Sequence, residues 1–458
     1  MTTIQTTSLG ELQARLRAEL TARLAVHRRR LDWDAGQLAA HQVDRLRALL
    51  ARAIEHSPFH ACRLGHIDPA RFGLADLGSL PAMTKAEMMA SFDDVITDRR
   101  LSRRLAEEHL RSSRHEPSLL LGDYVCLASG GSSGQRGVFV QTIGEYADHI
   151  ASILRPAVAR RAAAGAPAGV VAAMVAAASP VHSTGFVAAA CRGEPVDLVP
   201  VPATLPLAEG VGRLNALQPP ALVGYPSRLA QLAAEQRAGR LRITPEAVIA
   251  SSEMLTDADR AAITGGFGVP LVNSFASTEG LVGHSEPGGS VLTFAGDMCI
   301  AELVDEEGRP VPDGTASARV LITNLHNLTQ PMIRYELTDS FTACPGTAPG
   351  GHLRATVHGR DNGMFWYGPI ALHPNAVGTV TAATAAVTEY QVRQTPRGVD
   401  IAVVADRDLD QAVLAARLRD SLGRSGLPDP EVTVRIVDAI ARNPDTGKTR
   451  RFIPLQTS

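Results

Sequence analysis

The sequence predicts an α/β protein with a large, multi-layered N-terminal domain and a small α+β C-terminal domain. Between residues 168 and 340, short apolar runs alternate with helical segments, which is the pattern of a layered α/β domain. After residue 364, strand and helix signals recur as a separate group. A chain of 458 residues is long enough for more than one domain with its own core. We therefore predict an N-terminal domain over 1–360 and a C-terminal domain over 361–458.

The first third of the chain is predicted to be mainly helical. Its clearest helices, judged by apolar spacing, cover 9–31, 37–56 and 143–161. Pro58 ends the second of them, because proline cannot continue a helix. Within 72–97, Thr84 has the position of an N-cap before another helix.

The strands are predicted from short apolar runs bounded by turn residues. In the α/β part these runs are 170–175, 195–201, 221–223, 247–249 and 269–272. After Asn273 the chain becomes richer in strand signals, at 290–294, 299–304 and 319–323. In the C-terminal part we expect a hairpin of 390–393 and 399–405, a helix over 409–422 and a strand over 431–437.

Composition and charge exclude several classes of function. With 45% hydrophobic and 20% charged residues, the chain has the composition of a globular protein. A net charge of −2 gives no reason to expect nucleic acid or an anionic membrane as a partner. The most apolar region, 162–178, is too short and too rich in Ala and Gly to span a bilayer. Residues 1–10 lack a signal-peptide core, so we expect a cytoplasmic protein.

The cysteine and lysine contents carry more specific information. The five cysteines contain no C-x-x-C pair, which agrees with a reducing compartment and argues against structural zinc. Lys85 and Lys448 are the only lysines, whereas arginine is abundant. A lysine kept in such a chain indicates a site that needs a compact ammonium instead of a planar guanidinium. For Lys85, chance is an equally good interpretation.

A loop rich in glycine and serine, 129–137, follows an apolar run and allows three interpretations. Glycines permit close backbone approach, so the loop could surround phosphate oxygens with N–H groups. The same letters match a serine-nucleophile motif, with Ser132 or Ser133 as the attacking group. A plain flexible loop is the third interpretation. The loop alone does not decide among them.

Four later stretches favour the phosphate interpretation. The stretch 273–280 presents an aromatic ring, hydroxyls and a carboxylate after a predicted strand, which suits a base, a phosphate and Mg²⁺. The stretch 321–339 ends in Asp339, an acid suited to ribose hydroxyls. The other two are 358–364, where the local sequence pattern changes, and 445–450 near the C-terminus.

In this order and spacing, the motifs resemble the adenylate-forming superfamily, and within it the phenylacetate–CoA ligase-like branch. Two early segments resemble the branch's S-P-F-Y and L-P-x-x-T-K motifs, and five later ones its G-x-E, Y-G-x-S/T-E, I-R-Y-x-x-x-D, G-R-x-D-D-M and G-K-x-x-R motifs. In this sequence they are 55–60, 80–85, Ser252-Glu253, 275–279, 333–339, Gly359-Arg360 and Gly447-Lys448. Each match is weak alone, and seven in the right order are strong.

The resemblance implies a two-step reaction. A carboxylate attacks the α-phosphate of ATP, pyrophosphate leaves, and the acyl-adenylate then passes its acyl group to a nucleophile, usually coenzyme A. The catalytic residues implied are Lys448, Glu279 and Thr278, with Glu279 also the ligand of Mg²⁺. The residues implied to bind the nucleotide are Ser129, Gly131, Ser132, Ser133, Gly134, Ser252, Glu253, Phe275, Asp339 and Arg360. The C-terminal domain is implied to be mobile.

Within these roles the resemblance assigns each group a contact. The glycine loop holds the β- and γ-phosphates, Thr278 touches the α-phosphate and Phe275 covers the adenine. Asp339 binds the ribose hydroxyls, and Lys448 bridges the carboxylate and the α-phosphate, where a point charge offsets developing negative charge. His182 lies where the branch places its acid-binding segment.

Several positions depart from the family pattern, mainly around the second step. In the loop, Gly130 replaces a serine and Arg136 a proline. At the hinge, Asn362 and Gly363 replace two acids, and Gly378 replaces a glutamate. We therefore expect activation of an aryl or small carboxylic acid, and leave the acceptor open among coenzyme A, an amine and a carrier-protein thiol.

Two alternatives from other classes stay open. One is a serine amidohydrolase with Ser132 or Ser133 as nucleophile and Lys85 as base, which leaves the later motifs unused. The other is a nucleotide-binding regulatory protein without turnover. A homodimer is a further expectation, and the acid itself cannot be named from the sequence.

Overall fold

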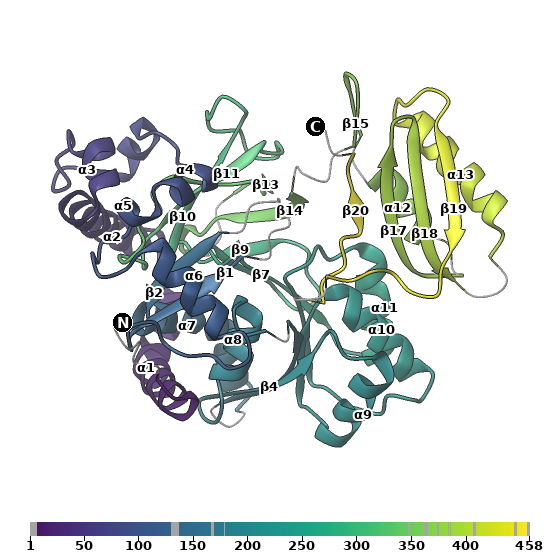
Figure 1. Cartoon of the computed structure of the whole chain (residues 1–458), viewed down its shortest axis with the longest axis horizontal. Helices are drawn as coiled ribbons and strands as arrows, with labels where there is room; N and C mark the ends of the chain where they lie inside the picture. Colours follow the sequence, from purple (N-terminus) through teal and green to yellow (C-terminus); the bar gives the residue numbers. More distant parts are fainter. Residues whose placement is uncertain are drawn as a thin grey trace.

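The computed structural model describes the chain over 7–129, 137–165, 169–177, 179–346, 349–360, 365–372, 375–382, 384, 386–405, 409–443 and 447–455. Figure 1 shows a large unit built from the N-terminal and central parts of the chain, with a small unit from the C-terminal part beside it. The gap between 360 and 365 falls between the last strand of the large unit's main sheet and the first strand of the small unit.

The N-terminal helices form where the sequence places them. Helix α1 (Leu9–Arg29) is capped by Ser8 and ends in a 3₁₀ turn, η1 (Arg30–Asp32). Helix α2 (Ala35–His56) starts in a capping box and stops before Pro58, as predicted. Pro58 then occupies the first turn of α3 (Pro58–Leu64), where its missing N–H costs nothing.

A series of short elements leads to the glycine loop. They are η2 (Leu74–Ser79), α4 (Lys85–Ala90), α5 (Phe92–Val95) and α6 (Arg103–Ser112). Strands β1 (Tyr124–Ala128) and β2 (Val138–Thr142) pair antiparallel on either side of the loop. Helix α7 (Ile143–Ala163) follows and packs against α1.

The main sheet of the large unit has nine strands in the order β13-β14-β9-β8-β7-β6-β5-β3-β4. Its parallel half consists of β3 (Val170–Ala176), β4 (Val196–Pro202), β5 (Ala221–Gly224), β6 (Ala247–Ser251) and β7 (Leu271–Ala276). The crossover helices are α8 (Ser183–Ala190), α9 (Leu207–Leu217), α10 (Pro226–Arg237) and α11 (Asp257–Phe267). The helix–strand alternation predicted over 168–340 is therefore confirmed for this half.

Strand β7 departs from the sequence prediction in one respect. We expected the strand to end at residue 272, with the stretch from Asn273 as a loop after it. Asn273, Ser274 and Phe275 instead lie inside β7, which pairs parallel with β6 through Ser274 and antiparallel with β8 from Ser274 to Ala276. The ladder to β8 (Val282–Ser285), a strand that the sequence did not predict, keeps the backbone extended past the expected end.

The other strands of the large unit are antiparallel. Strands β9 (Leu292–Phe294), β13 (Asp339–Ala343) and β14 (Arg354–Arg360) complete the main sheet, with η3 (Pro349–Gly351) before β14. Strands β10 (Cys299–Val304), β11 (Arg319–Asn324) and β12 (Tyr335–Leu337) form a separate three-stranded sheet. Strands β12, β13 and β14 were not predicted from the sequence.

In its described residues the small unit has a hairpin, a four-stranded sheet and two helices. Its elements are β15 (Phe365–Tyr367), β16 (Ile370–Leu372), α12 (Asn375–Ala382), β17 (Val387–Thr395), β18 (Gly398–Ala405), α13 (Gln411–Arg424), β19 (Glu431–Ile436) and β20 (Phe452–Ile453). The predicted hairpin, helix and final strand correspond to β17–β18, α13 and β19. Strand β20 joins the sheet parallel to β17.

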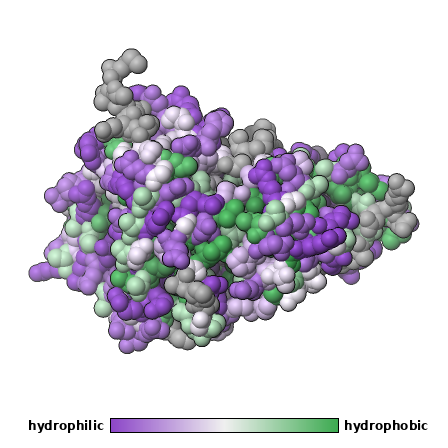
Figure 2. Space-filling view, turned by 90° about the horizontal axis from the view of Figure 1, so that it is seen from below, coloured by the Kyte–Doolittle hydropathy of each residue, from purple (hydrophilic) through white to green (hydrophobic). Residues whose placement is uncertain are grey.

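Each unit has its own apolar core. In the large unit one cluster joins α1, α7 and the parallel strands, and another joins α4–α6 to the antiparallel strands. The small unit's cluster contains only residues from Phe365 onward. Figure 2 shows hydrophilic residues over most of the face seen from below, with small groups of hydrophobic ones between them. Among the described residues, no helix is both long and apolar enough to cross a membrane.

Candidate active site

The carboxyl ends of the parallel strands meet at one edge of the main sheet. Gly224 at the end of β5 pairs with Val175 of β3 and Ala250 of β6, and Ser251 of β6 pairs with Ser274 of β7. The loops that follow these strands therefore lie side by side. In open α/β sheets, ligands bind at this edge.

The turn after β7 presents Glu279 at this edge. Ser277 closes the turn, because its carbonyl accepts from the Gly280 N–H (3.1 Å) and its hydroxyl from the Leu281 N–H (3.1 Å). Gly280 has φ +110°, and a Cβ there would lie 2.2 Å from Asn324 Nδ2. Asn324 Nδ2 also donates to the Glu279 carbonyl (2.8 Å). Glu279 is 4% exposed, and Thr278 beside it is partly exposed.

Lys85 contacts the Glu279 carboxylate. The sequence alone had left open whether Lys85 has a functional role. Its Nζ lies 3.5 Å from Glu279 Oε1, so an ion pair joins residues far apart in the chain. Lys85 is the first residue of α4, whose N-cap Thr84 forms a capping box with Glu87. Two signals in the sequence pointed to Lys85: the scarcity of lysine and the L-P-x-x-T-K match at 80–85. The structure places Lys85 beside Glu279, at the carboxyl edge of the sheet.

The predicted I-R-Y motif fixes the segment that carries Lys85. Met83 forms a bridge with Tyr335, and its N–H donates to the Arg334 carbonyl (2.9 Å). The Arg334 guanidinium donates to the Gly78 carbonyl (3.0 Å) and pairs with Glu302 (3.0 Å). Arg334 is thus a structural clamp, because its side chain points to the backbone before Lys85.

The glycine loop is described only at its base. Gly131, Ser132, Ser133 and Gly134 lie outside the described residues. Ser129 Oγ accepts from the Gly137 N–H (2.8 Å), and the Ser129 N–H donates to the Gly137 carbonyl (2.9 Å). The hydroxyl of Ser129 therefore closes the loop within the chain.

The loop base lies beside the start of α8. The Ala128 N–H donates to the Val181 carbonyl (2.8 Å), and His182 Nδ1 lies 3.2 Å from the Ala128 carbonyl oxygen. His182 is the N-cap residue of α8, which follows β3. The predicted acid-binding segment and the glycine loop thus share this edge of the sheet.

The loop after β6 contacts the C-terminal part of the chain. Ser252 has φ +69°, an unusual value for serine, and Glu253 follows it. Glu253 Oε2 accepts from the Ser227 N–H (3.3 Å), and Oε1 accepts from the Thr449 N–H (3.0 Å). Both carboxylate oxygens of Glu253 therefore accept hydrogen bonds from backbone N–H groups. One of these N–H groups belongs to the final segment of the small unit.

Lys448 reaches the same edge from the small unit. Its Nζ lies 5.5 Å from the centroid of the Tyr225 ring, in the loop after β5. Gly447 packs so closely that a Cβ there would lie 3.1 Å from the Ala203 Cβ, after β4. Burial raises the pKa of Tyr225 to about 12, so its hydroxyl stays protonated at neutral pH. Figure 1 shows the yellow C-terminal segment crossing to the large unit near α10 and α11.

The remaining predicted nucleotide contacts lie on β7, β13 and β14. The Phe275 ring meets the edges of Phe294 and Phe341, with centroid separations of 5.9 and 5.4 Å. Asp339 is 8% exposed at the start of β13, two residues before Phe341, and pairs in register with Arg360. The Arg360 side chain lies outside the described atoms.

The site's acidic groups suit a magnesium ion that arrives with phosphates. Among the described residues, no cluster of three or more His, Cys, Asp or Glu side chains could hold a metal ion. Mg²⁺ is commonly bound by one or two carboxylates together with substrate phosphates and water. The buried carboxylate of Glu279, with no such cluster around it among the described residues, fits that mode and does not fit a metal cage made of protein alone.

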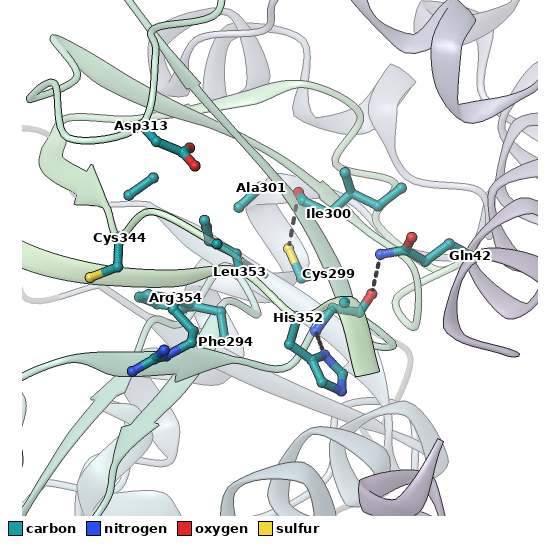
Figure 3. A pocket seen from close by; sticks show the side chains of 14 residues that line it. Gln42, Phe294, Cys299, Ile300, Ala301, Asp313, Cys344, His352, Leu353 and Arg354 are labelled. Carbon is teal, nitrogen blue, oxygen red and sulfur yellow. Dashed lines mark hydrogen bonds between the residues drawn. The ribbon is translucent and has the colours of Figure 1, made fainter. Parts of the chain in front are cut away.

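A separate hollow of about 290 Å³ lies between β10 and the β13–β14 region. Figure 3 shows its lining, which includes Phe294, Cys299, Cys344 and His352. None of the predicted site residues lines it. Phe294 links it to the site, because the same ring contacts Phe275.

Comparison with known proteins places the fold. No protein-family model and no curated protein matches the chain. A 2-hydroxyisobutyryl-CoA ligase in the postadenylation state, in complex with R3-HIB-AMP, matches 93% of this chain and 92% of its own at 18% identity, with a TM-score of 0.69. A benzoate CoA ligase from Burkholderia xenovorans LB400 matches 71% of this chain and 67% of its own at 18% identity, with a TM-score of 0.51.

An enzyme with another kind of product has the same fold. The amide bond synthetase McbA from Marinactinospora thermotolerans matches 70% of this chain and 67% of its own at 15% identity, with a TM-score of 0.52. The chain therefore has the two-domain fold of adenylate-forming CoA ligases, which confirms the predicted fold class. The phenylacetate–CoA ligase-like branch stays a prediction, because these ligases carry other names.

The TM-score differs between two structures of the matched ligase. The TM-score is 0.70 for its postadenylation state with 2-HIB-AMP, and 0.57 for its thioesterfication state with 2-HIB-AMP and CoA. The two matches cover similar shares of this chain, 92% and 93%.

Proposed function

We propose that the protein activates an aryl or small carboxylic acid with ATP and transfers the acyl group to coenzyme A. One observation carries the proposal: Glu279 of the fourth motif and Lys448 of the last lie at the carboxyl edge of one parallel sheet. A buried carboxylate and two lysines suit the handling of a triphosphate and a carboxylate.

In the first step the carboxylate oxygen of the acid bonds to the α-phosphorus of ATP. The bond to the β-phosphate breaks, and pyrophosphate leaves with its electron pair. Lys448 would hold the attacking carboxylate and the α-phosphate together, and Thr278 would donate to the α-phosphate. Approach of two anions is unfavourable, so a fixed ammonium between them lowers the barrier.

The nucleotide would lie along the sheet edge. Phe275 would contact the adenine, Asp339 the ribose hydroxyls and the loop 129–137 the outer phosphates, with Ser252, Glu253 and Arg360 at its border. Mg²⁺, when bound through Glu279, offsets phosphate charge. Lys85 would face the same phosphates, because it already contacts that carboxylate.

The second step would need movement of the small unit. We propose a hinge at the motif that begins with Gly359-Arg360, between domains 1–360 and 361–458; its positions Asn362 and Gly363 lie outside the described residues. A thiol of coenzyme A would then attack the acyl carbon, and AMP would leave. The amide bond synthetase among the matched structures supports an amine as the second candidate acceptor.

The Lys85–Glu279 ion pair weighs against the serine amidohydrolase alternative. In that alternative Lys85 must take the proton of the attacking serine, whereas its Nζ lies 3.5 Å from Glu279 Oε1 in an ion pair. That alternative predicts amide cleavage without ATP, lost when Ser132 and Ser133 are changed to alanine.

Acid-dependent exchange of radiolabelled pyrophosphate into ATP tests the proposal. We expect exchange with at least one acid from a panel of aryl and short aliphatic acids, and none without acid. Absence of exchange across the panel would overturn the proposal. Product analysis with CoA and with amines then identifies the acceptor, and a failure with CoA removes only the thioester step.

A further inference from the structure

The last described segment, 447–455, is attached to the large unit by a partly buried ion pair. Arg451 Nη1 and Nη2 lie 2.8 and 3.3 Å from the two carboxylate oxygens of Asp259, on the first turn of α11. The side chains are only 18% and 10% exposed. A two-bond pair of this kind fixes orientation as well as distance.

Both partners of this pair are fixed by their own units. Asp259 Oδ2 accepts from the hydroxyl of Thr256, the N-cap of α11 (2.8 Å), and the same hydroxyl accepts from the Asp259 N–H (3.1 Å). The Arg451 guanidinium lies over the Tyr390 ring of β17, 5.0 Å from its centroid. The pair therefore joins a rigid helix start in one unit to the sheet of the other.

Lys448 lies on the short stretch that these contacts hold. Thr449, the next residue, donates its N–H to Glu253, and Arg451 follows two residues later. On the other side, Gly447 packs against Ala203. A shift of the Arg451 anchor would therefore move the Lys448 ammonium, and displacement by about 1 Å can cost about 100-fold in rate.

We propose that Asp259 is a positioning residue for acid activation, which acts through Arg451 to hold Lys448 at the sheet edge. The inference rests on the proposed function. Asp259 touches neither Lys448 nor the other predicted site residues in any contact described above. Asp259 acts only while the segment 447–455 is docked on the large unit. Acyl transfer from a preformed adenylate therefore does not depend on Asp259.

Two substitutions and their combination test the pair. Asp259→Asn and Arg451→Gln should each slow pyrophosphate exchange about 10- to 100-fold. The double variant should be no slower than the worse single variant, because both remove the same interaction. Asp259→Glu keeps the charge and should recover part of the rate. The control is Asp257→Asn, an exposed acid on the same turn that has no ion pair with a described residue, and it should match the wild type.

A second measurement separates positioning from general damage. The acyl-adenylate of the acid with the fastest exchange is supplied ready-made, and transfer to the acceptor is timed. Asp259→Asn should transfer within about twofold of the wild type, whereas a destabilised variant would be slow in both steps. Equal losses in both steps, or no loss of exchange, would overturn the proposal.

A third measurement does not depend on activity. Hydrogen exchange of the segment 447–455 in the full-length protein should be faster in Asp259→Asn than in Asp257→Asn. If the wild type shows no acid-dependent pyrophosphate exchange, the proposed function fails while this result still tests the anchor. Equal hydrogen exchange in the two variants would overturn the anchor alone.

Discussion

The two lysines of the chain reach the same sheet edge by different means. Lys85 is held within the large unit by a capping box, a backbone bridge and the Arg334 clamp. Lys448 is held across two units by the hydrogen bond from the Thr449 N–H to Glu253 and by the Arg451–Asp259 ion pair. The first set of contacts is internal to one folded core, and the second joins two cores.

This difference indicates which lysine stays at the sheet edge in the folded protein and which one reaches it only when the two units are in contact. Contacts inside a packed core open only with unfolding, whereas a few polar contacts between units can exchange with water at modest cost. The apolar clusters of the two units share no residue. We infer that Lys85 is a fixed part of the site and that Lys448 is present only when the tail is docked.

The largest effect on activity is expected when the charge of Lys448 is removed. Lys448→Ala should lower acid-dependent pyrophosphate exchange about 10²- to 10³-fold, the usual cost of one preorganised transition-state contact. Lys448→Arg should stay far below the wild type, because a planar guanidinium cannot replace a compact point charge between the attacking carboxylate and the α-phosphate, the role proposed for Lys448. Exchange is measured at saturating acid and ATP. A wild-type rate in Lys448→Ala would mean that the docked tail does not serve the reaction.

The fixed side of the comparison is tested at the Glu279 turn. Gly280→Ala should cost about 2 to 4 kcal/mol of stability, because its φ of +110° is strained for alanine and the Cβ would collide with Asn324 Nδ2. Gly288→Ala is the matched control. Its φ is +80° with nothing within 4 Å of the added Cβ, so about 1 kcal/mol is expected. Urea unfolding curves measure both, and equal losses would contradict a rigid turn.

Most of the scaffold on the fixed side could be predicted from the sequence. Apolar spacing and capping residues gave α1, α2, α4 and α7, and apolar runs gave β3 to β6. Strands β8 and β12–β14 were missed, because three- to seven-residue strands with polar positions are stabilised by pairing partners far away in the chain. The extension of β7 through Phe275 was missed for the same reason.

The candidate site was predictable as motifs but not as geometry. The motif order indicated Glu279 and Lys448, whereas nothing in the letters around Lys85 indicates that its ammonium meets Glu279, 194 positions later. Arg451 was noted only as the last letter of the G-K-x-x-R match, without a role, and Asp259 was not singled out, because an ordinary helix acid gains its role only from the docking of the remote segment 447–455. Long-range charge pairs depend on topology, which one sequence does not display.

A smaller effect is expected for the fixed lysine. Lys85→Met keeps most of the side-chain volume and removes the charge beside Glu279, so pyrophosphate exchange should fall about 10-fold, with a higher KM for ATP as the main cause. The control is Glu87→Gln, which changes only the capping box and should lower stability more than exchange. A KM for ATP equal to the wild type in Lys85→Met would contradict a phosphate-facing role.

The smallest effect concerns the packing behind the Glu279 turn. His326, two residues after Asn324, stacks on His149 with ring centroids 5.6 Å apart. Burial lowers the pKa of His149 to about 3 and that of His326 to about 4. An unfolded histidine has a pKa near 6.5, so the unfolded chain binds more protons between about pH 6.5 and 4. Stability should therefore fall as the pH falls through this range.

His149→Phe measures this contribution. Within the described part of the chain, His149 Nδ1 is buried without a hydrogen-bond partner, so the substitution loses little at pH 7.5. Each such histidine contributes about 1.4 kcal/mol per pH unit to the slope, and the variant's curve should be shallower by about that amount. Urea unfolding at pH 7.5, 6.0 and 5.0 gives the slopes, with the exposed His66→Phe as control. An unchanged slope in His149→Phe would mean that His149 binds protons equally well in the folded and the unfolded protein. The packing behind the Glu279 turn would then carry a positive charge at pH 5.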